Sequence, residues 1–121
     1  MAVAGLWGVT LDCPDPDGLA RFYQRLTGGE IVYADHVSTH LRVGAFTLGF
    51  QRDPAYRAPT WPDPETPQQC HVDLSTPDLD GAMTAAVLAG ARLANHQPQP
   101  TVFRVLFDPA GHPFCLSNWD F

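Results

Sequence analysis

Cationic side chains are scarce in this sequence of 121 residues. Lys and Arg together number seven, against thirteen Asp and Glu, so the formal net charge is −6 at neutral pH. No run of basic residues occurs along the chain. Binding to nucleic acid or to an anionic membrane depends on clustered positive charge. The composition therefore argues against both partners, and it suits a cationic ligand.

Long apolar runs are also missing, and none approaches the length that a membrane-spanning helix needs. The first residues lack the basic and apolar regions of a signal peptide, so we expect none. The three cysteines, Cys13, Cys70 and Cys115, are odd in number, widely spaced and form no CxxC pair. This usage favours reduced thiols in the cytoplasm over a disulfide framework or a zinc knuckle.

The chain contains an internal repeat, in which residues 71–81 restate residues 8–18. A repeat of this kind predicts two copies of one supersecondary unit. Its main change in chemical character is at the first position, where Gly8 in the first copy becomes His71 in the second. The identical pairs are Val9/Val72, Leu11/Leu74, Pro14/Pro77, Asp15/Asp78, Asp17/Asp80 and Gly18/Gly81.

Hydrophobic periodicity and turn residues predict the same order of elements in both halves. Each half reads as a strand, a helix and three further strands. Helices are expected over 15–27 and 78–89, and strands over 7–12, 30–35, 36–43, 46–52, 70–76, 93–96, 102–107 and 113–119. The aspartates that begin both helices are explained as helix caps rather than as a carboxylate site.

These elements predict an α+β protein built from two tandem β-α-β-β-β units in a single domain, 1–121. The first unit covers 6–52 and the second 69–121. Residues 53–68 form a connector, and its five prolines exclude a helix or a central strand. We expect two mixed sheets that form a cup, with the helices on the outer faces.

Strand alternation predicts which side chains face the cup. In the strand over 102–107, Phe103, Val105 and Phe107 suit the helix side, which leaves Arg104 toward the cup. A polar sheet face can also face solvent, but both units would have to expose one here, so a ligand pocket is favoured. The residues expected to contact a ligand are His40, Gln51, Trp61, His71, Asp73, Arg104 and Cys115.

Several segments resemble the vicinal oxygen chelate superfamily, which includes glyoxalase I, extradiol dioxygenases, and fosfomycin- and bleomycin-resistance proteins. The duplicated unit, the helix end at 22–28, His71-Val72-Asp73-Leu74 and the segment 108–116 carry the resemblance. The proline-rich segment 58–69 is typical of the short actinobacterial glyoxalase-like group. The resemblance covers essentially the whole chain, and it implies the fold more specifically than any activity.

The resemblance also implies where metal ligands would lie, namely at Gly8, Gly49, His71 and Cys115. Glycine side chains cannot coordinate, and a cysteine stands where a glutamate is typical. Two ligands do not hold a catalytic divalent ion, because catalytic zinc sites keep about three protein ligands. We therefore expect no cofactor and a vestigial metal site. A divalent metal remains the alternative if other ligands are recruited.

His71 has two interpretations, as a hydrogen-bonding or acid–base group in the cup and as a structural remnant of a metal site. Cys115 is a nucleophile if a cation lowers its pKa, and otherwise a buried inert thiol. Arg104 suits a carboxylate or phosphate, or an ion pair with Asp73 or Asp12.

Trp61 stacks on a ligand or packs the connector onto the sheet. His36 and His40 lie on a predicted strand, where four residues span roughly 13 Å, so they cannot share one metal ion. They are expected at the surface or at the rim of the cup.

Two functions follow from these features. The first is metal-independent binding or sequestration of a small molecule by a homodimer. The second is a lyase, isomerase or dioxygenase-type enzyme that uses His71 as its base, with a metal only if further ligands are supplied.

Overall fold

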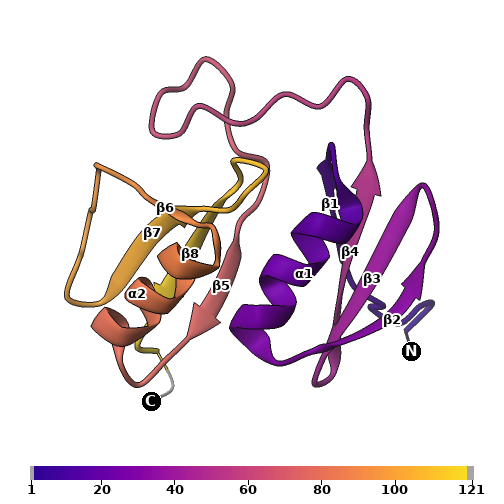
Figure 1. The fold of residues 1–121 in the computed structure, drawn as a ribbon, viewed down its shortest axis with the longest axis horizontal. Helices are drawn as coiled ribbons and strands as arrows, with labels where there is room; N and C mark the ends of the chain where they lie inside the picture. Colours follow the sequence, from indigo (N-terminus) through magenta and orange to yellow (C-terminus); the bar gives the residue numbers. More distant parts are fainter. Residues whose placement is uncertain (1, 120–121) are drawn as a thin grey trace. The chain divides into compact units, whose positions relative to one another are not determined.

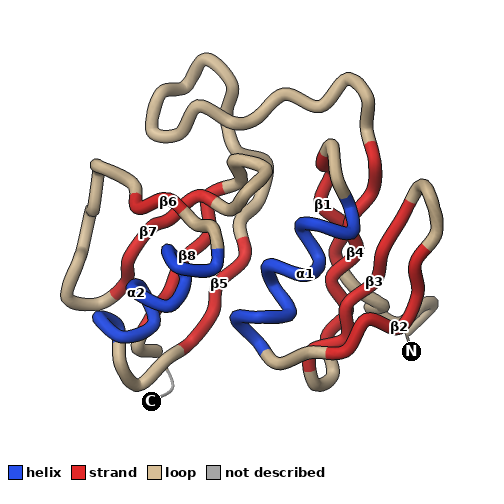
Figure 2. Tube along the Cα trace, in the orientation of Figure 1, coloured by secondary structure: helices blue, strands red, loops and turns tan. Residues whose placement is uncertain are grey.

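The structure, a computed structural model, describes residues 2–119. This part of the chain forms two compact units that divide between Tyr56 and Arg57 (Figure 1). The division falls inside the proline-rich connector, which is loop and turn throughout (Figure 2). Positions 120–121 of the predicted second unit lie outside the described residues.

The first unit folds as a strand, a helix and three strands. Its four-stranded sheet has the order β1-β4-β3-β2, with β1 parallel to β4 and the other neighbours antiparallel. The prediction of a mixed sheet with one covering helix is therefore confirmed for this unit. Its elements are β1 (Val9–Cys13), α1 (Pro16–Thr27), β2 (Glu30–Ala34), β3 (Ser38–Val43) and β4 (Phe46–Arg52).

The second unit repeats this arrangement. Its sheet has the order β5-β8-β7-β6, and β5 is parallel to β8 as β1 is to β4. The repeat in the sequence is thus a repeat in the fold, and the α+β class is confirmed. The elements are β5 (Val72–Ser75), α2 (Leu79–Ala89), β6 (Arg92–Leu93), β7 (Phe103–Phe107) and β8 (Pro113–Ser117).

The repeated aspartates and glycines begin the two helices. Asp15 accepts a hydrogen bond from the backbone N–H of Gly18 at 3.1 Å, and Asp78 accepts one from Gly81 at 3.0 Å. A Cβ at Gly18 would lie 2.3 Å from an Asp15 carboxylate oxygen. The capping carboxylate therefore occupies the space of a side chain, which explains why both copies keep glycine there.

The two helices pack differently on their sheets. In α1, Leu19, Phe22 and Tyr23 are buried, and Tyr23 stacks on Phe50 of β4 with ring centroids 5.7 Å apart. In α2 only Ala86 is buried among the residues of the helix. The lean second helix therefore gives its unit a thinner core. Neither helix within residues 2–119 has the length and apolarity needed to cross a membrane.

The strand predicted at 93–96 is shorter than expected and covers only Arg92–Leu93. The side chain of Gln97 takes the place of further strand pairing. Its amide nitrogen donates to the carbonyls of Ala94 and Val105, and its oxygen accepts from the N–H of Val105. Backbone groups that a longer strand would satisfy are thus satisfied by one side chain.

The faces predicted for the strand at 102–107 are wrong. Phe114 and Leu116 pack on the helix side, and the antiparallel register places Leu106 and Arg104 directly opposite them. Arg104 therefore shares the helix side, and its guanidinium lies 3.0 Å from Asp80 in the first turn of α2. The long side chain reaches this carboxylate along the helix, which the alternation of apolar residues could not reveal.

The turn before β8 requires glycine at position 111. Gly111 has φ +92°, and an added Cβ would lie 2.8 Å from the Cβ of Ala58. We expect Gly111→Ala to lower the free energy of unfolding by about 1–2 kcal/mol, because it combines backbone strain with a steric overlap. Urea denaturation measures the loss, with Gly5→Ala as the control, since a Cβ there meets nothing within 4 Å. An equal stability of both variants would contradict this role.

Candidate functional site

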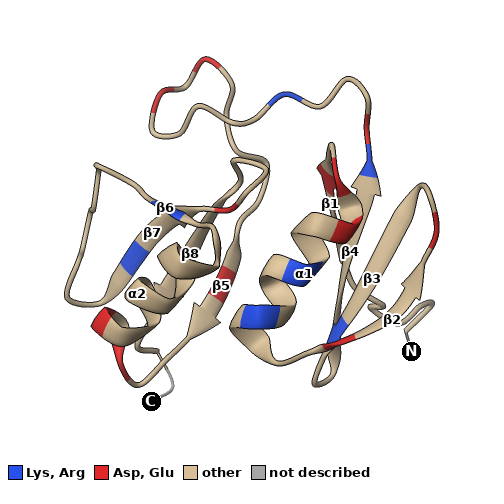
Figure 3. Cartoon of the chain, viewed as in Figure 1, with Lys and Arg blue, Asp and Glu red and all other residues tan. Residues whose placement is uncertain are grey.

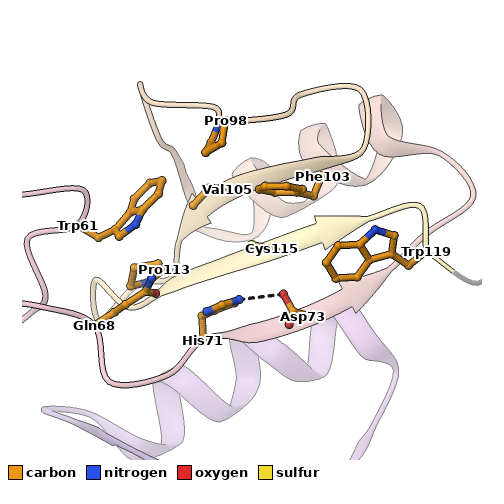
Figure 4. A pocket seen from close by; sticks show the side chains of 10 residues that line it. All are labelled: Trp61, Gln68, His71, Asp73, Pro98, Phe103, Val105, Pro113, Cys115 and Trp119. Atoms are coloured by element: carbon orange, nitrogen blue, oxygen red, sulfur yellow. Dashed lines mark ion pairs between the residues drawn. The ribbon is translucent and has the colours of Figure 1, made fainter.

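The second unit contains a pocket of about 190 Å³ on the sheet face opposite α2 (Figure 4). Its floor comes from β5, β7 and β8, because Asp73, Cys115 and Val105 lie in register across these three strands. Residues of the connector and of the loop after β6 complete its wall. All the residues that line it belong to one unit.

The polar floor of the pocket is formed by His71, Asp73 and Cys115, which the sequence predicted to share one face. His71 immediately precedes β5, and Asp73 lies two residues later, so both side chains project to the same side. His71 Nε2 lies 3.2 Å from Asp73 Oδ1, and both side chains are about two-fifths exposed, 40% and 44%. Asp73 therefore orients His71 while keeping lone pairs open to the pocket.

Cys115 is buried beneath this pair, with 8% of its surface exposed. Burial, followed by the charge of Asp73 and a hydrogen bond to that carboxylate, raises the pKa of the Cys115 thiol to about 11. Nucleophilic cysteines need the opposite shift, toward the thiolate. The structure thus favours the inert thiol over the nucleophile.

We expect Cys115 to resist alkylation near neutral pH. With a thiol pKa of about 11, roughly one molecule in a thousand carries the thiolate at pH 8. Iodoacetamide labelling read by mass spectrometry should modify the exposed Cys70 first and reach Cys115 only as the pH approaches 11. Labelling of Cys115 as fast as Cys70 at pH 7 would show that the thiol is activated.

Aromatic rings form the upper part of the pocket. Trp61 lies at one end, with Gln68 below it, and Trp119 lies at the other end beside Asp73 (Figure 4). The ring of Phe103 lies 6.2 Å from that of Trp119 at an angle of 51°. The pocket therefore has an apolar roof over a floor with one carboxylate.

Trp61 also anchors the connector. Its ring lies 5.6 Å from that of His96 and 6.4 Å from that of Phe107, and it packs against the buried cluster that contains Val105 and Cys115. The packing role predicted for Trp61 is confirmed, and the same side chain lines the pocket. Trp61 therefore both holds the connector on the sheet and forms part of the pocket wall.

Three other predicted site residues lie elsewhere. Arg104 is directed toward α2, where it pairs with Asp80 and donates to the carbonyl of Pro100. His40 and Gln51 belong to the first unit, on β3 and β4. In that unit the ring of His40 lies 4.9 Å from that of Trp7 and 5.0 Å from that of Tyr33.

The first unit carries almost no ligating chemistry at the matching positions. There the register pairs Thr10 with Gly49, as it pairs Asp73 with Cys115 in the second unit. A Cβ at Gly49 would lie 2.6 Å from Thr10 Oγ1, and one at Gly8 would lie 2.3 Å from the carbonyl oxygen of Thr47. A ligand side chain would therefore overlap backbone at position 8 and the Thr10 side chain at position 49.

A divalent metal of the kind bound by oxygen donors does not fit the remaining site. His71, Asp73 and Cys115 offer one nitrogen, one oxygen and one sulfur within 4.8 Å of one another. A thiol with a raised pKa is a poor ligand for Mn²⁺, which prefers carboxylates and carbonyls. The donor set matches zinc chemistry better, although zinc would first have to displace the thiol proton.

Sequence reasoning missed six residues that line the pocket, namely Gln68, Pro98, Phe103, Val105, Pro113 and Trp119. A signal for Phe103 was present in the turn at 108–111. The turn fixes the register of β7 and β8, so that Leu106 lies opposite Phe114, which packs on the helix side. Leu106 therefore also faces the helix, and Phe103 and Val105 face the pocket. Gln68 and Trp119 lie beyond regular strands, where alternation gives no direction.

Solved structures with the same fold have low sequence identity to this chain. A mutant of the fosfomycin resistance protein FosX from Listeria monocytogenes, complexed with Mn(II) and dihydroxypropylphosphonic acid, is 15% identical with a TM-score of 0.74. The match covers 97% of this chain and 91% of that one. At this identity the likeness shows the fold alone.

Two further structures extend the comparison. A glyoxalase/bleomycin resistance protein/dioxygenase family enzyme from Burkholderia phytofirmans is 18% identical, with a TM-score of 0.75 over 93% of this chain and 97% of that one. FosX from Mesorhizobium loti is 14% identical, with a TM-score of 0.71 over 97% and 93%.

None of the curated proteins compared with this chain matches it. The family model of the glyoxalase-like domain, in contrast, matches residues 8–117 and so spans both units. The match includes both copies of the repeat and the whole floor of the pocket. The chain therefore belongs to the glyoxalase-like domain family, within the vicinal oxygen chelate superfamily.

Proposed function

We propose that this protein binds a small organic molecule without a metal ion, in the pocket of the second unit. The observation that carries the proposal is the pairing of an aromatic roof with the His71–Asp73 floor. Apolar walls with a few placed polar groups are typical of ligand sites. The cytoplasmic location and the two-fold dimer predicted above belong to this proposal.

The size of the pocket limits the ligand. Sites for drug-sized molecules usually enclose about 300–1,000 Å³. The pocket of the second unit is smaller, at about 190 Å³, so it suits a small metabolite or one group of a larger molecule. Sequestration of such a molecule requires no proton transfer and no activated thiol.

Tryptophan fluorescence and melting temperature test the proposal in the presence of EDTA. Trp61 and Trp119 lie at the two ends of the pocket, so a bound molecule should change their emission and raise the melting temperature. Small cations, anions and neutral aromatic compounds should be compared. Ligands that act only after a divalent metal is added would overturn metal-independent binding.

A second candidate function is a metal-dependent enzyme of the lyase type. It is favoured by one observation, the three donors of His71, Asp73 and Cys115 within 4.8 Å. Three protein ligands and an open position are the usual pattern of catalytic zinc. In this alternative His71 is a ligand rather than the base predicted from the sequence.

Metal titration separates the two candidates. If the site is metal-independent, we expect Zn²⁺, Ni²⁺, Mn²⁺ and Fe²⁺ to leave the melting temperature of metal-free protein unchanged. A zinc enzyme would be stabilised by Zn²⁺, by about 2.7 kcal/mol at a hundredfold excess over its dissociation constant. Loss of that stabilisation in Cys115→Ser but not in Cys70→Ser would assign the ion to this site.

A further inference from the structure

Two of the polar groups that line the pocket are acceptors, the Asp73 carboxylate and Gln68 Oε1. Asp73 presents a half-exposed carboxylate, and His71 Nε2 is directed to that carboxylate rather than to the open space. At the other end, Gln68 Oε1 is buried and accepts no hydrogen bond from any residue in 2–119. A buried acceptor without a donor is costly, so such an atom calls for a partner.

Arginine and lysine are missing from the lining. The second unit has three arginines and no lysine. None of the three lines the pocket, since Arg104 pairs with Asp80 and Arg92 lies over the ring of Phe107 at 4.5 Å. Figure 3 shows basic positions scattered along both units. An anion placed beside Asp73 would therefore meet a carboxylate with no arginine or lysine to offset the repulsion.

Aromatic faces complete the acceptor site at one end. Phe103 and Trp119 form a corner of two rings, and Asp73 lies beside it (Figure 4). Aromatic faces attract organic cations, and tryptophan does so most strongly. A carboxylate next to two such rings offers a protonated amine both an ion pair and aromatic faces.

We propose that the ligand is an organic cation with an apolar body, an inference that rests on the proposed binding function. Its ammonium group lies against Asp73, Phe103 and Trp119. Its body extends toward Trp61, where an N–H or O–H donor satisfies Gln68 after rotation of the amide. The site thus selects amines over the anionic compounds complexed with the FosX proteins, a phosphonic acid in one structure and sulfate in another.

Tyramine is a suitable probe, because it carries an ammonium group, a planar body and a hydroxyl donor at the far end. Hydroxyphenylpropionate is its anionic counterpart of similar shape, and phenethylammonium lacks only the hydroxyl. Calorimetric titration in EDTA should give the tightest binding for tyramine. The anion should bind at least tenfold more weakly, a factor that corresponds to ~1.4 kcal/mol.

Two charge-removing variants locate the cation. Asp73→Asn should weaken tyramine binding about tenfold. Glu65→Gln removes the same charge from an exposed connector residue outside the pocket lining, and it should leave the affinity unchanged. Trp119→Leu provides a second, uncharged test and should weaken the cation about fivefold. Melting curves confirm that each variant is folded.

The outcomes separate this inference from the function on which it rests. Equal affinities for tyramine and its anion, or equal effects of Asp73→Asn and Glu65→Gln, overturn the selection of cations. Tighter binding of the anion than of tyramine, with a change in tryptophan emission, overturns it too, but leaves a small-molecule binding protein. Equal affinities for tyramine and phenethylammonium overturn the role of Gln68. If no compound of any charge binds, the inference and the proposed function both fall.

Discussion

In EDTA, Cys115→Glu should lower the free energy of unfolding by about 3 kcal/mol, because a carboxylate would then lie in a buried position beside Asp73. Mn²⁺ should reverse the loss, since His71, Asp73 and the new glutamate offer only nitrogen and oxygen donors. Thermal denaturation with and without Mn²⁺ measures both effects. They form the largest expected response of this protein to one substitution.

Cys115→Gln is the matched control, because glutamine has the shape of glutamate without its charge. It should cost less stability and gain no response to Mn²⁺. The wild type should also show no response, since its donor set includes a protonated thiol. Stabilisation of the wild type by Mn²⁺ to the same extent as Cys115→Glu would contradict the expectation that the wild-type donors do not hold this ion.

Trp61→Ala should lower the free energy of unfolding by about 2–3 kcal/mol. Full truncation of a buried tryptophan costs about 3–5 kcal/mol, and Trp61 is half-buried. The variant removes the ring that packs on Phe107 and on the cluster around Val105, so the connector should also become sensitive to proteolysis. Urea denaturation and limited trypsin digestion at Arg57 measure the two consequences.

Trp61→Phe separates packing from ligand contact. A phenyl ring should retain most of the stability, but it is smaller than the indole and should contact a bound ligand less. If Trp61 contributes only to the connector, Trp61→Phe will bind the ligand as the wild type does. Unchanged stability in Trp61→Ala would show that the connector does not depend on this ring.

The fold was predictable because the sequence states it twice. The Asp–Gly pairs of the caps and the shared strand residues each have one structural explanation, and the structure confirms it in both units. The shared face of β5 and β8 was also predicted correctly, since His71, Asp73 and Cys115 lie on it together. Comparison of the two copies identified the position where their chemistry differs most.

The rest of the site was not predictable from local pattern. β7 is apolar on both faces, with Val105 on one and Leu106 on the other, so alternation alone could not orient it. The ion pair of Arg104 with Asp80 depends on the register set by the following turn. Gln68 and Trp119 reach the pocket from segments outside the strands, and tertiary packing alone decides their direction.

The most direct measurement is a calorimetric titration of tyramine into metal-free protein, repeated after addition of Zn²⁺ or Mn²⁺. We expect saturable binding in EDTA, with an affinity that neither ion increases, because Asp73 and the aromatic rings hold the ligand by themselves. Binding that appears only after a metal ion is added would contradict a metal-independent site in the second unit.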